Sequence, residues 1–550
     1  MTRHVPRHRT LLAIALAASL SPAVGFAQQS SAPADQFRAA TDDAPDERER
    51  RAASDTGAAT QSAATQLDKV VVRGLSGAAT LRSVSSPISV MTAEDIERKQ
   101  ALNLTDLLRG QLPGMSMLMG SQNDWTTIVN ARGNTGWNPG LSDLDNEYMK
   151  ILIDDVEVVR PTLLSMIDPK SIEQIEIVRG PLAGAMYGAE GSSGVMRITT
   201  KKGRPGQAPE FVAQLAAGVI ESDYKSKDVT PLVIDKSLQV IGGGDAVSYR
   251  LGVSETDVGA WVPGYDSKTR MASGAAQGMW GPFDVSVSGI HSDRSLALSV
   301  LQLKPECAGA PAGGECASTM DYPMSETLFA TTIGYEASPD WQHTLTFGYD
   351  QNKFGYEGMQ FDRVSAKTSD YERRTVRYFT NYSTDLSEDF SGRFTLGADL
   401  VLYRGAEAEG GAGHDHGDDA GHSHNVVANW RNLGYYGVAE LGFRDRLYLT
   451  LAGRLEQRLR KVSSAHDSPF QPRAGLSYVF GGEGDMTVKA RVQWGTSARA
   501  PVGQPFATAN NYLLPVDLRP EDKSRLGCRP GFHVGRHRYA FDHPLRRGRT

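Results

Sequence analysis

The 550-residue sequence has no internal run approaching ~20 consecutive apolar residues, the length that a membrane-spanning helix needs. A polytopic helical membrane protein is therefore excluded. A transmembrane β-barrel is not excluded, because its strands alternate apolar and polar side chains and leave only a weak hydropathy signal. The 57 glycines and 19 tyrosines suit a chain that is rich in strands and turns.

The sequence also has few cysteines and a small net charge. Three cysteines are too few for a fold built on disulfides. A formal charge of -6 argues against a nucleic-acid-binding protein. The sequence contains no HExxH, nucleophile-elbow, P-loop or CxxC motif, so it does not predict an enzyme.

The N-terminus has the pattern of a secretory signal. A basic start is followed by the apolar run Leu11–Leu20, and small residues lead to a cleavage position after Ala27. We therefore expect residues 1–27 to be removed on export. Residues 28–82 predict a periplasmic linker, most of it too poor in apolar side chains to offset the entropy cost of ordering.

Within this linker, residues 66–74 read QLDKVVVRG. Asp68, Lys69, Val70, Val71 and Val72 form a short β-prone run on a flexible tether. Such a run can add as an extra strand to the exposed sheet edge of a partner. The alternative is an ordinary first strand.

Residues 83–203 predict a compact α/β unit. Thr92 is expected to cap a helix whose first turn carries Glu94 and Asp95. Leu102–Gly110 has helical spacing and ends at a glycine. Strands are expected at Pro87–Met91, Gly114–Met119, Thr127–Gly133, Ile151–Val159 and Ser171–Gly180, with a final strand within Tyr187–Gly203.

The segments SPISVMTAEDIE, LTDLLRGQLPGMSM, IVNARG, ILIDDVEV and IEQIEIVRGPLAGAMYGAEGSSGVMRITTKKG follow one another in this order. Together they resemble the plug domain of TonB-dependent outer-membrane receptors. The DKVVV run stands where that family has its TonB box, which implies that Asp68–Val72 bind TonB. Asp155 stands where the family often has glycine, and Arg73 where threonine is common.

The rest of the chain, residues 204–524, predicts barrel strands. Met486–Thr496 alternates strictly between apolar and polar residues, and similar stretches surround Asp399 and Arg454. The resemblance implies a mostly β fold: a transmembrane antiparallel β-barrel of 22 strands, of which about 13 are visible here, occluded by the N-terminal α/β plug. Aromatic residues at expected strand ends predict interfacial girdles: Trp341, Tyr349, Tyr435 and Tyr436.

The C-terminus departs from this pattern. After Ser524 the alternation disappears, and residues 525–550 are rich in arginine. We expect an anomalous tail outside the barrel, from a frameshifted or truncated reading frame. The alternative is a divergent soluble tail.

The strongest local signal for a ligand is the run HDHGDDAGHSH, residues 414–424. Imidazole and carboxylate groups between glycines suit zinc, copper or nickel as cargo. The expected metal ligands are His414, Asp415, His416, His422 and His424. The alternative is a solvated polar loop that binds nothing in particular.

Other candidate sites are weaker. The resemblance places Asn123, Asp124, Trp125, Asn134, Trp137 and Asn138 at the plug apex beneath the ligand. Met115, Met117 and Met119 share one strand face and are expected to pack in a core rather than bind Cu(I). Cys307 and Cys316 enclose a short loop and are expected to form a structural disulfide, whereas Cys528 has no expected partner.

These observations predict a TonB-dependent receptor in the outer membrane of a Gram-negative bacterium. It would be a monomer that binds TonB and outer-membrane lipid, needs no cofactor, and takes up a metal ion or a metal complex such as a siderophore. Uptake of cobalamin or a glycan, or a truncated remnant that transports nothing, are the alternatives.

Overall fold

A computed structural model describes one compact unit of the chain, and every statement below concerns its described residues. These are residues 71–72, 79–80, 86–110, 115–119, 127–131, 134–135, 149–179, 183–188, 194–221, 230–260, 266–301, 317–360, 363–411, 424–459, 470–480, 486–499, 521–534, 537–540 and 543–545. In these ranges, none of the helices has the length and apolar character needed to cross a membrane.

The first part of the unit is a small α/β domain, as the sequence predicts. Its main sheet has the order β3-β9-β10-β7-β8, in which only β7 and β10 pair in parallel, and β4, β5 and β6 form a second sheet. The elements are β3 (Ile88–Thr92), α2 (Ala93–Lys99), α3 (Leu104–Leu108), β4 (Met115–Met119), β5 (Thr127–Ala131), β6 (Asn134–Thr135), β7 (Lys150–Ile153), β8 (Val156–Glu157), η1 (Pro161–Ser165), η2 (Pro169–Ser171), β9 (Ile172–Val178), α4 (Ala183–Tyr187) and β10 (Val195–Thr200).

Local sequence explains how this domain begins. The Thr92 side chain accepts a hydrogen bond from the backbone N–H of Asp95, and the Asp95 carboxylate accepts one from the backbone N–H of Thr92. This reciprocal capping box satisfies two donors that a helix start leaves unpaired. It confirms Thr92 as the N-cap. Ile96, Leu104, Leu107 and Leu108 then turn inward to the core of the domain.

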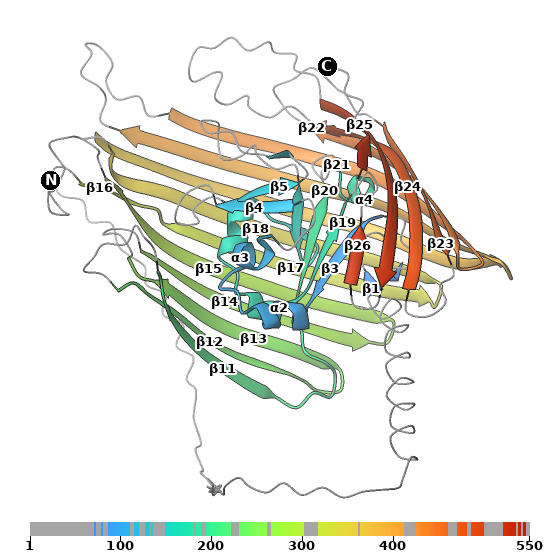
Figure 1. Cartoon of the computed structure of the whole chain (residues 1–550), viewed down its shortest axis with the longest axis horizontal. Coiled ribbons are helices and arrows are strands. Elements are labelled where there is room, and N and C mark those ends of the chain that lie inside the picture. The colour runs from blue at the N-terminus through green and yellow to red at the C-terminus, as the bar shows by residue number, and fades with distance from the viewer. Residues whose placement is uncertain are drawn as a thin grey trace, which may run out of the picture. The chain divides into compact units, whose positions relative to one another are not determined.

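The second part is one antiparallel sheet of 17 strands (Figure 1). Its strands are β11 (Glu210–Val219), β12 (Leu232–Gly243), β13 (Val247–Val258), β14 (Ser267–Trp280), β15 (Phe283–Leu301), β16 (Ala317–Asp321), β17 (Met324–Ser338), β18 (Trp341–Gln360), β19 (Arg363–Ser387), β20 (Phe390–Gly411), β21 (His424–Phe443), β22 (Leu447–Leu459), β23 (Phe470–Phe480), β24 (Met486–Arg499), β25 (Glu521–Val534), β26 (His537–Ala540) and β27 (His543–Leu545). The predicted mostly β fold with an α/β plug is confirmed.

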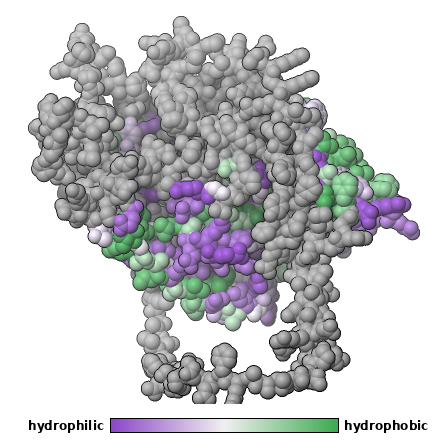
Figure 2. All heavy atoms as spheres, in the orientation of Figure 1, coloured by the Kyte–Doolittle hydropathy of each residue, from purple (hydrophilic) through white to green (hydrophobic). Residues whose placement is uncertain are grey.

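Alternation along these strands decides which face meets the small domain. On β20 the Leu396 side chain is 65% exposed, whereas its neighbour Thr395 is 1% exposed. On β22 Leu451 is 46% exposed and Arg454 is 1% exposed. On these two strands polar and charged side chains therefore face inward, toward the small domain, and apolar ones face outward, as the sequence predicts for a wall that meets lipid. On β14 to β18 some inward positions are apolar, and Ile290, Leu328 and Phe354 pack in one buried cluster with the small domain. Coloured by hydropathy, hydrophilic residues gather near the centre of the same view, and hydrophobic residues occupy much of the right-hand margin (Figure 2).

Exposed aromatic side chains line the outward face where the strands meet in short turns. Phe283 packs against Tyr335 with ring centroids 5.0 Å apart, and Phe390 packs against Phe443 at 4.6 Å. Trp341 is exposed at the same end, in agreement with the predicted girdle. The prediction is wrong for Tyr436, which is 4% exposed, because its position on β21 has inward parity.

The C-terminal segment contributes the last strands of the described sheet. Residues 525–534 continue β25, which pairs with β24 along its whole length, so the sheet does not end at Ser524. Pairing of this kind uses backbone N–H and C=O groups and needs no alternation of side chains. From β11 to β24 the sheet has 14 strands, in agreement with the about 13 expected over this range, and β25, β26 and β27 lie at its end.

Candidate functional site

The tether ends in a very small sheet. β1 (Val71–Val72) pairs antiparallel with β2 (Ala79–Thr80), with Val71 opposite Thr80. Asp68, Lys69 and Val70 lie outside the described residues. An isolated two-stranded pairing of this length is marginal in water, so little free energy is needed to open it and offer the segment to another sheet.

The hairpin between β7 and β8 is a tight two-residue turn. Its central residues, Asp154 and Asp155, have φ of 47° and 68°. Two consecutive positive φ values are typical of a type I′ turn, which glycine or asparagine usually fills and aspartate tolerates. Asp155 thus adopts a backbone conformation that favours the glycine expected from the family pattern.

An ion pair within the small domain accounts for aspartate at this strained position. The Arg197 guanidinium on β10 donates to both carboxylate oxygens of Asp155, at 2.7 and 2.8 Å. Burial alone would raise the pKa of Asp155, but Arg197 holds it well below its ordinary value. The same contact raises the pKa of Arg197 against the effect of burial. No local sequence pattern predicts this pair, because Asp155 lies in the β7–β8 turn and Arg197 lies on β10.

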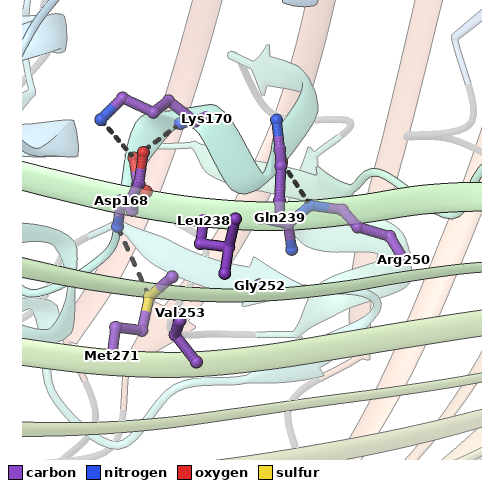
Figure 3. A pocket seen from close by; sticks show the side chains of 9 residues that line it. Asp168, Lys170, Leu238, Gln239, Arg250, Gly252, Val253 and Met271 are labelled. Atoms are coloured by element: carbon purple, nitrogen blue, oxygen red, sulfur yellow. Dashed lines mark hydrogen bonds and ion pairs between the residues drawn. The ribbon is translucent and has the colours of Figure 1, made fainter. Parts of the chain in front are cut away.

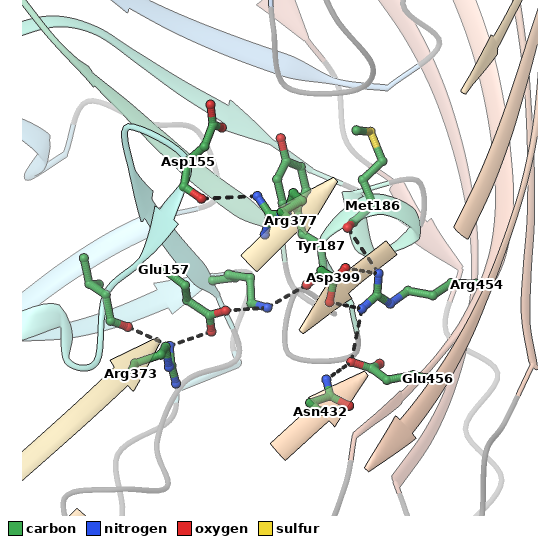
Figure 4. Close-up of polar contacts among 12 residues, drawn as sticks. Asp155, Glu157, Met186, Tyr187, Arg373, Arg377, Asp399, Asn432, Arg454 and Glu456 are labelled. Carbon is green, nitrogen blue, oxygen red and sulfur yellow. Dashed lines mark hydrogen bonds and ion pairs between the residues drawn. The ribbon is translucent and has the colours of Figure 1, made fainter. Parts of the chain in front are cut away.

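The β7–β8 hairpin is also bound to the large sheet (Figure 4). Arg373 on β19 lies 2.6 Å from the Glu157 carboxylate and donates to the backbone oxygen of Val158 at 2.8 Å. Lys150 holds the other side of Glu157 at 2.7 Å and donates to the Tyr187 backbone oxygen, also at 2.7 Å. Arg377, two inward positions beyond Arg373 on β19, donates to the backbone oxygen of Asp155.

A second contact forms at α4. Arg454 on β22 donates to both oxygens of Asp399 at 2.8 and 2.9 Å and to the backbone oxygen of Met186 at 3.3 Å. Close approach requires glycine on the small domain: a Cβ at Gly188 would lie 2.8 Å from the Glu456 carboxylate. Gly184 and Gly188 therefore have a packing role at this contact.

These contacts are ionic and directed at backbone oxygens. The attraction in a buried ion pair is largely offset by the cost of removing both charges from water. If the two parts separate and water enters, hydration of the charges can therefore recover much of the free energy that the broken ion pairs had contributed. The apolar part of the interface, where Ile290 and Leu328 of the sheet share a buried cluster with Met166 of the small domain, has no such compensation.

Burial raises the pKa of Tyr187 to about 12, so its phenol stays neutral and offers no acid–base chemistry near pH 7.

One pocket lies at the seam between η2 and strands β12 to β14 (Figure 3). Its cavity volume is about 10 Å³, and its polar lining includes Asp168, Lys170, Gln239 and Arg250. Small-molecule sites usually enclose roughly 300–1,000 Å³ and are mostly apolar. Lys170 also forms an ion pair with Asp235 at 2.5 Å across the seam. We read this pocket as part of the domain contact rather than as a cargo site.

Most sequence-predicted ligand residues lie outside the described residues: Asn123, Asp124, Trp125, Trp137, Asn138, His414, Asp415, His416, His422, Cys307 and Cys316. Asn134 begins β6 and His424 begins β21. Met115 is 7% exposed and belongs to the core, as the packing interpretation predicts. Among the described residues there is no group of three or more histidine, cysteine or acidic side chains that could hold a metal ion.

Two family models match the chain. Residues 80–195 match the TonB-dependent receptor plug domain, and residues 317–522 match the TonB-dependent receptor-like β-barrel. The sequence is similar to the TonB-dependent receptor SusC of Bacteroides thetaiotaomicron, with 30% identity over 155 residues. It is also similar to the vitamin B12 transporter BtuB of Photobacterium profundum, with 33% identity over 142 residues. These matches cover 26% and 25% of this chain but only 14% and 21% of the relatives.

The fold is similar to two solved structures at low sequence identity. The RagAB peptide importer aligns with a TM-score of 0.66 at 13% identity, over 86% of this chain and 67% of that chain. The ferric citrate transporter FecA aligns with a TM-score of 0.64 at 14% identity, over 82% and 68%. At such identity the likeness concerns the fold.

The Asp155–Arg197 pair leads to a prediction. Replacing Asp155 by alanine removes the ion pair and leaves a residue unsuited to positive φ, so the domain should lose roughly 2–4 kcal/mol of local stability. Glycine restores only the backbone freedom and asparagine only a polar side chain that tolerates this φ, so both should cost less. The measurement is native-state hydrogen exchange of β7 and β10 in the full chain.

Asp389 provides the matched control. It pairs with Arg444 in an exposed turn at 3.0 Å, and Asp389→Asn should change exchange little because exposed pairs contribute little. Equal exchange in the wild type and Asp155→Ala would show that the buried pair does not hold the hairpin.

Proposed function

Because its two parts match both models of the family, the chain belongs to the TonB-dependent receptor family, and we propose that it takes up a scarce nutrient across a bacterial outer membrane. The energy would come from TonB, which would bind the Asp68–Val72 segment. The outer membrane has no ATP, so work must arrive mechanically through a partner. The chain would act as a transporter and would catalyse no reaction.

The observation that supports this proposal most is the contact between the small domain and the inward face of the sheet. Arg373 and Arg454 hold the domain from two directions, through Glu157 and through the Met186 backbone oxygen. Such a contact keeps the passage closed at rest and can be re-solvated when the domain moves. The marginal pairing of Val71 with Thr80 leaves the tether free to engage a partner strand.

For the cargo we propose a metal ion or a metal complex such as a siderophore. The support is the cluster of histidine and aspartate in residues 414–424, because imidazole and carboxylate together suit zinc, copper or nickel. The similarity in fold to a ferric citrate transporter is compatible with a metal complex. Relatives named for vitamin B12 and peptides keep cobalamin, a glycan or a peptide as the second candidate.

The tether is tested by replacing Val71 with proline. Proline removes a backbone donor and fixes φ, so the segment should no longer add to a partner sheet. We expect uptake to fall to the background of cells that lack the receptor, while surface binding of the same probe is unchanged. The measurement is accumulation of ⁵⁵Fe-loaded siderophores and of ⁶⁵Zn²⁺, each with a binding assay on de-energised cells.

Ala58→Pro is the matched control, because it places the same substitution in the linker outside the predicted box. Its uptake should equal that of the wild type. Normal uptake by Val71→Pro would show that TonB does not engage this segment. Uptake of neither probe by the wild type would reject a metal cargo.

The histidine-rich segment has its own test. Neutral imidazole is the metal ligand, and histidine titrates near ~6.5, so affinity should fall steeply between about pH 7 and pH 5.5. Replacing His414, His416, His422 and His424 by alanine should weaken capture at low metal concentration and matter little at high concentration. The measurement is calorimetry of the full chain and its variant with Zn²⁺, Cu²⁺ and Ni²⁺.

A variant with the same four histidines changed to glutamine serves as the control for loop polarity. If the wild type binds none of the three metals more tightly than this variant, the metal reading loses its support in the sequence. An organic cargo would then be the better hypothesis.

A further inference from the structure

Three arginines stand together on the outward face of the large sheet, on adjacent strands. They are Arg374 on β19, Arg404 on β20 and Arg431 on β21, and all three are exposed. Leu402 lies directly opposite both Arg374 and Arg431, and Arg404 is the next outward residue after Leu402. Diagonal neighbours on one sheet face have Cβ atoms roughly 7–8 Å apart. The long side chains of this arginine cluster can therefore converge on one group.

The positive charge of the arginine cluster is not balanced. Arg374 pairs with Glu372 on its own strand, and Glu372 lies opposite Arg404. In the part of the chain that the structure describes, neither Arg404 nor Arg431 has an ion-pair partner within 4.0 Å. One carboxylate thus accompanies three guanidinium groups.

Another outward-facing charged group shows the contrast. On β12 to β14, Lys236 and Arg270 lie 3.0 and 2.8 Å from Glu255, and Lys268 lies 3.1 Å from Asp257. Glu255 also lies 3.9 Å from Lys268, so these charges compensate one another within the sheet. Of these two groups of described residues, the arginine cluster is the one that leaves cations without an ion-pair partner, so it can bind an external anion.

The cluster lies at a definite level on the sheet. Between Leu433 and Phe443 the outward positions of β21 carry no charge, and the same holds between Phe390 and Leu402 on β20. At about 3.3 Å per residue and a tilt of roughly 40°, the ten steps from Leu433 to Phe443 span about 25 Å across a membrane. That is the height of the apolar band of a transmembrane barrel.

The aromatic pair Phe390–Phe443 lies at one end of this neutral run, next to the short β19–β20 turn and the turn after β21. The arginine cluster marks the other end, on the side of the longer connection between β20 and β21. Guanidinium groups just beyond an apolar band lie at the level of lipid headgroups.

We propose that the arginine cluster binds the diphosphorylated sugar headgroup of a glycolipid in the outer leaflet. Arginine presents paired donors that match phosphate oxygens, and its charge stays in place at any physiological pH. Leu402 and the half-exposed Tyr435 supply apolar contact for the first segments of the acyl chains. This inference rests on the membrane location in the proposed function but on neither its cargo nor its energy source.

The test is titration of the detergent-purified full chain with fluorescent diphosphoryl lipid A. The double variant Arg404→Gln/Arg431→Gln should bind on the order of tenfold more weakly, because two charge-assisted contacts are lost. Arg404→Lys/Arg431→Lys should fall in between, since charge remains without paired donors. Arg270→Gln, from the compensated group, is the matched control and should bind like the wild type.

Changes in the lipid test the same site without any mutation. Lipid A stripped of both phosphates should bind the wild type as weakly as the double variant binds the intact lipid. Phosphatidylglycerol should bind more weakly than diphosphoryl lipid A, and millimolar inorganic phosphate should not compete. Equal binding by wild type and double variant, an equal loss in Arg270→Gln, or equal binding of phosphatidylglycerol would each overturn the proposal.

The proposed uptake function and the proposed lipid site can be rejected independently of each other. Val71→Pro should bind lipid A like the wild type even though it takes up no probe. The double variant should still accumulate whichever probe the wild type accumulates. Loss of lipid binding in Val71→Pro would indicate a disturbed fold and would contradict the proposed lipid site at the arginine cluster.

Discussion

Charges on the inward face of the sheet need partners away from water, and the rest of the arrangement follows from this constraint. Arg373, Arg454 and Asp399 are all almost completely buried. An unpaired buried charge costs several kcal/mol, so each must meet an opposite charge or an oriented dipole. Some partners come from the sheet itself, as Asp399 does for Arg454, and others come from the small domain, as Glu157 does for Arg373. The small domain thus completes the inner face electrostatically.

The outward face of the same strands is mostly apolar. There, leucine, phenylalanine and tyrosine face outward, and on β20 and β21 the charged residues of this face appear only where the neutral runs end. Lys236, Arg270 and Glu255 form a compensated group, whereas Arg404 and Arg431 do not. Because successive side chains of a strand point to opposite faces, each strand serves two purposes. Its inward face makes polar contacts with the small domain that can be broken, and its outward face is apolar with charged residues at its edge.

Sequence reasoning succeeded where a signal is local. The Thr92 cap, the short strands of the small domain and the alternation around Arg454 could all be found from neighbouring residues. It failed where the signal is not local. Tyr436 looked like a girdle residue, but strand parity places it inside. The barrel boundary at Ser524 stays a prediction: the barrel family model ends at residue 522, and β25 pairs onward with β24 as far as Val534.

The sequence by itself determined the two-part organisation, the inward and outward faces of most strands, and the family, because all three depend on patterns within a few residues. Only the tertiary structure decided which charges meet. Asp155 and Arg197 are 42 residues apart, and Arg373 donates to the backbone oxygen of Val158 across 215 residues. Such pairs depend on the register of the sheet against the small domain. Register arises from the sum of all strand pairings and packing contacts, so no short stretch of sequence encodes it.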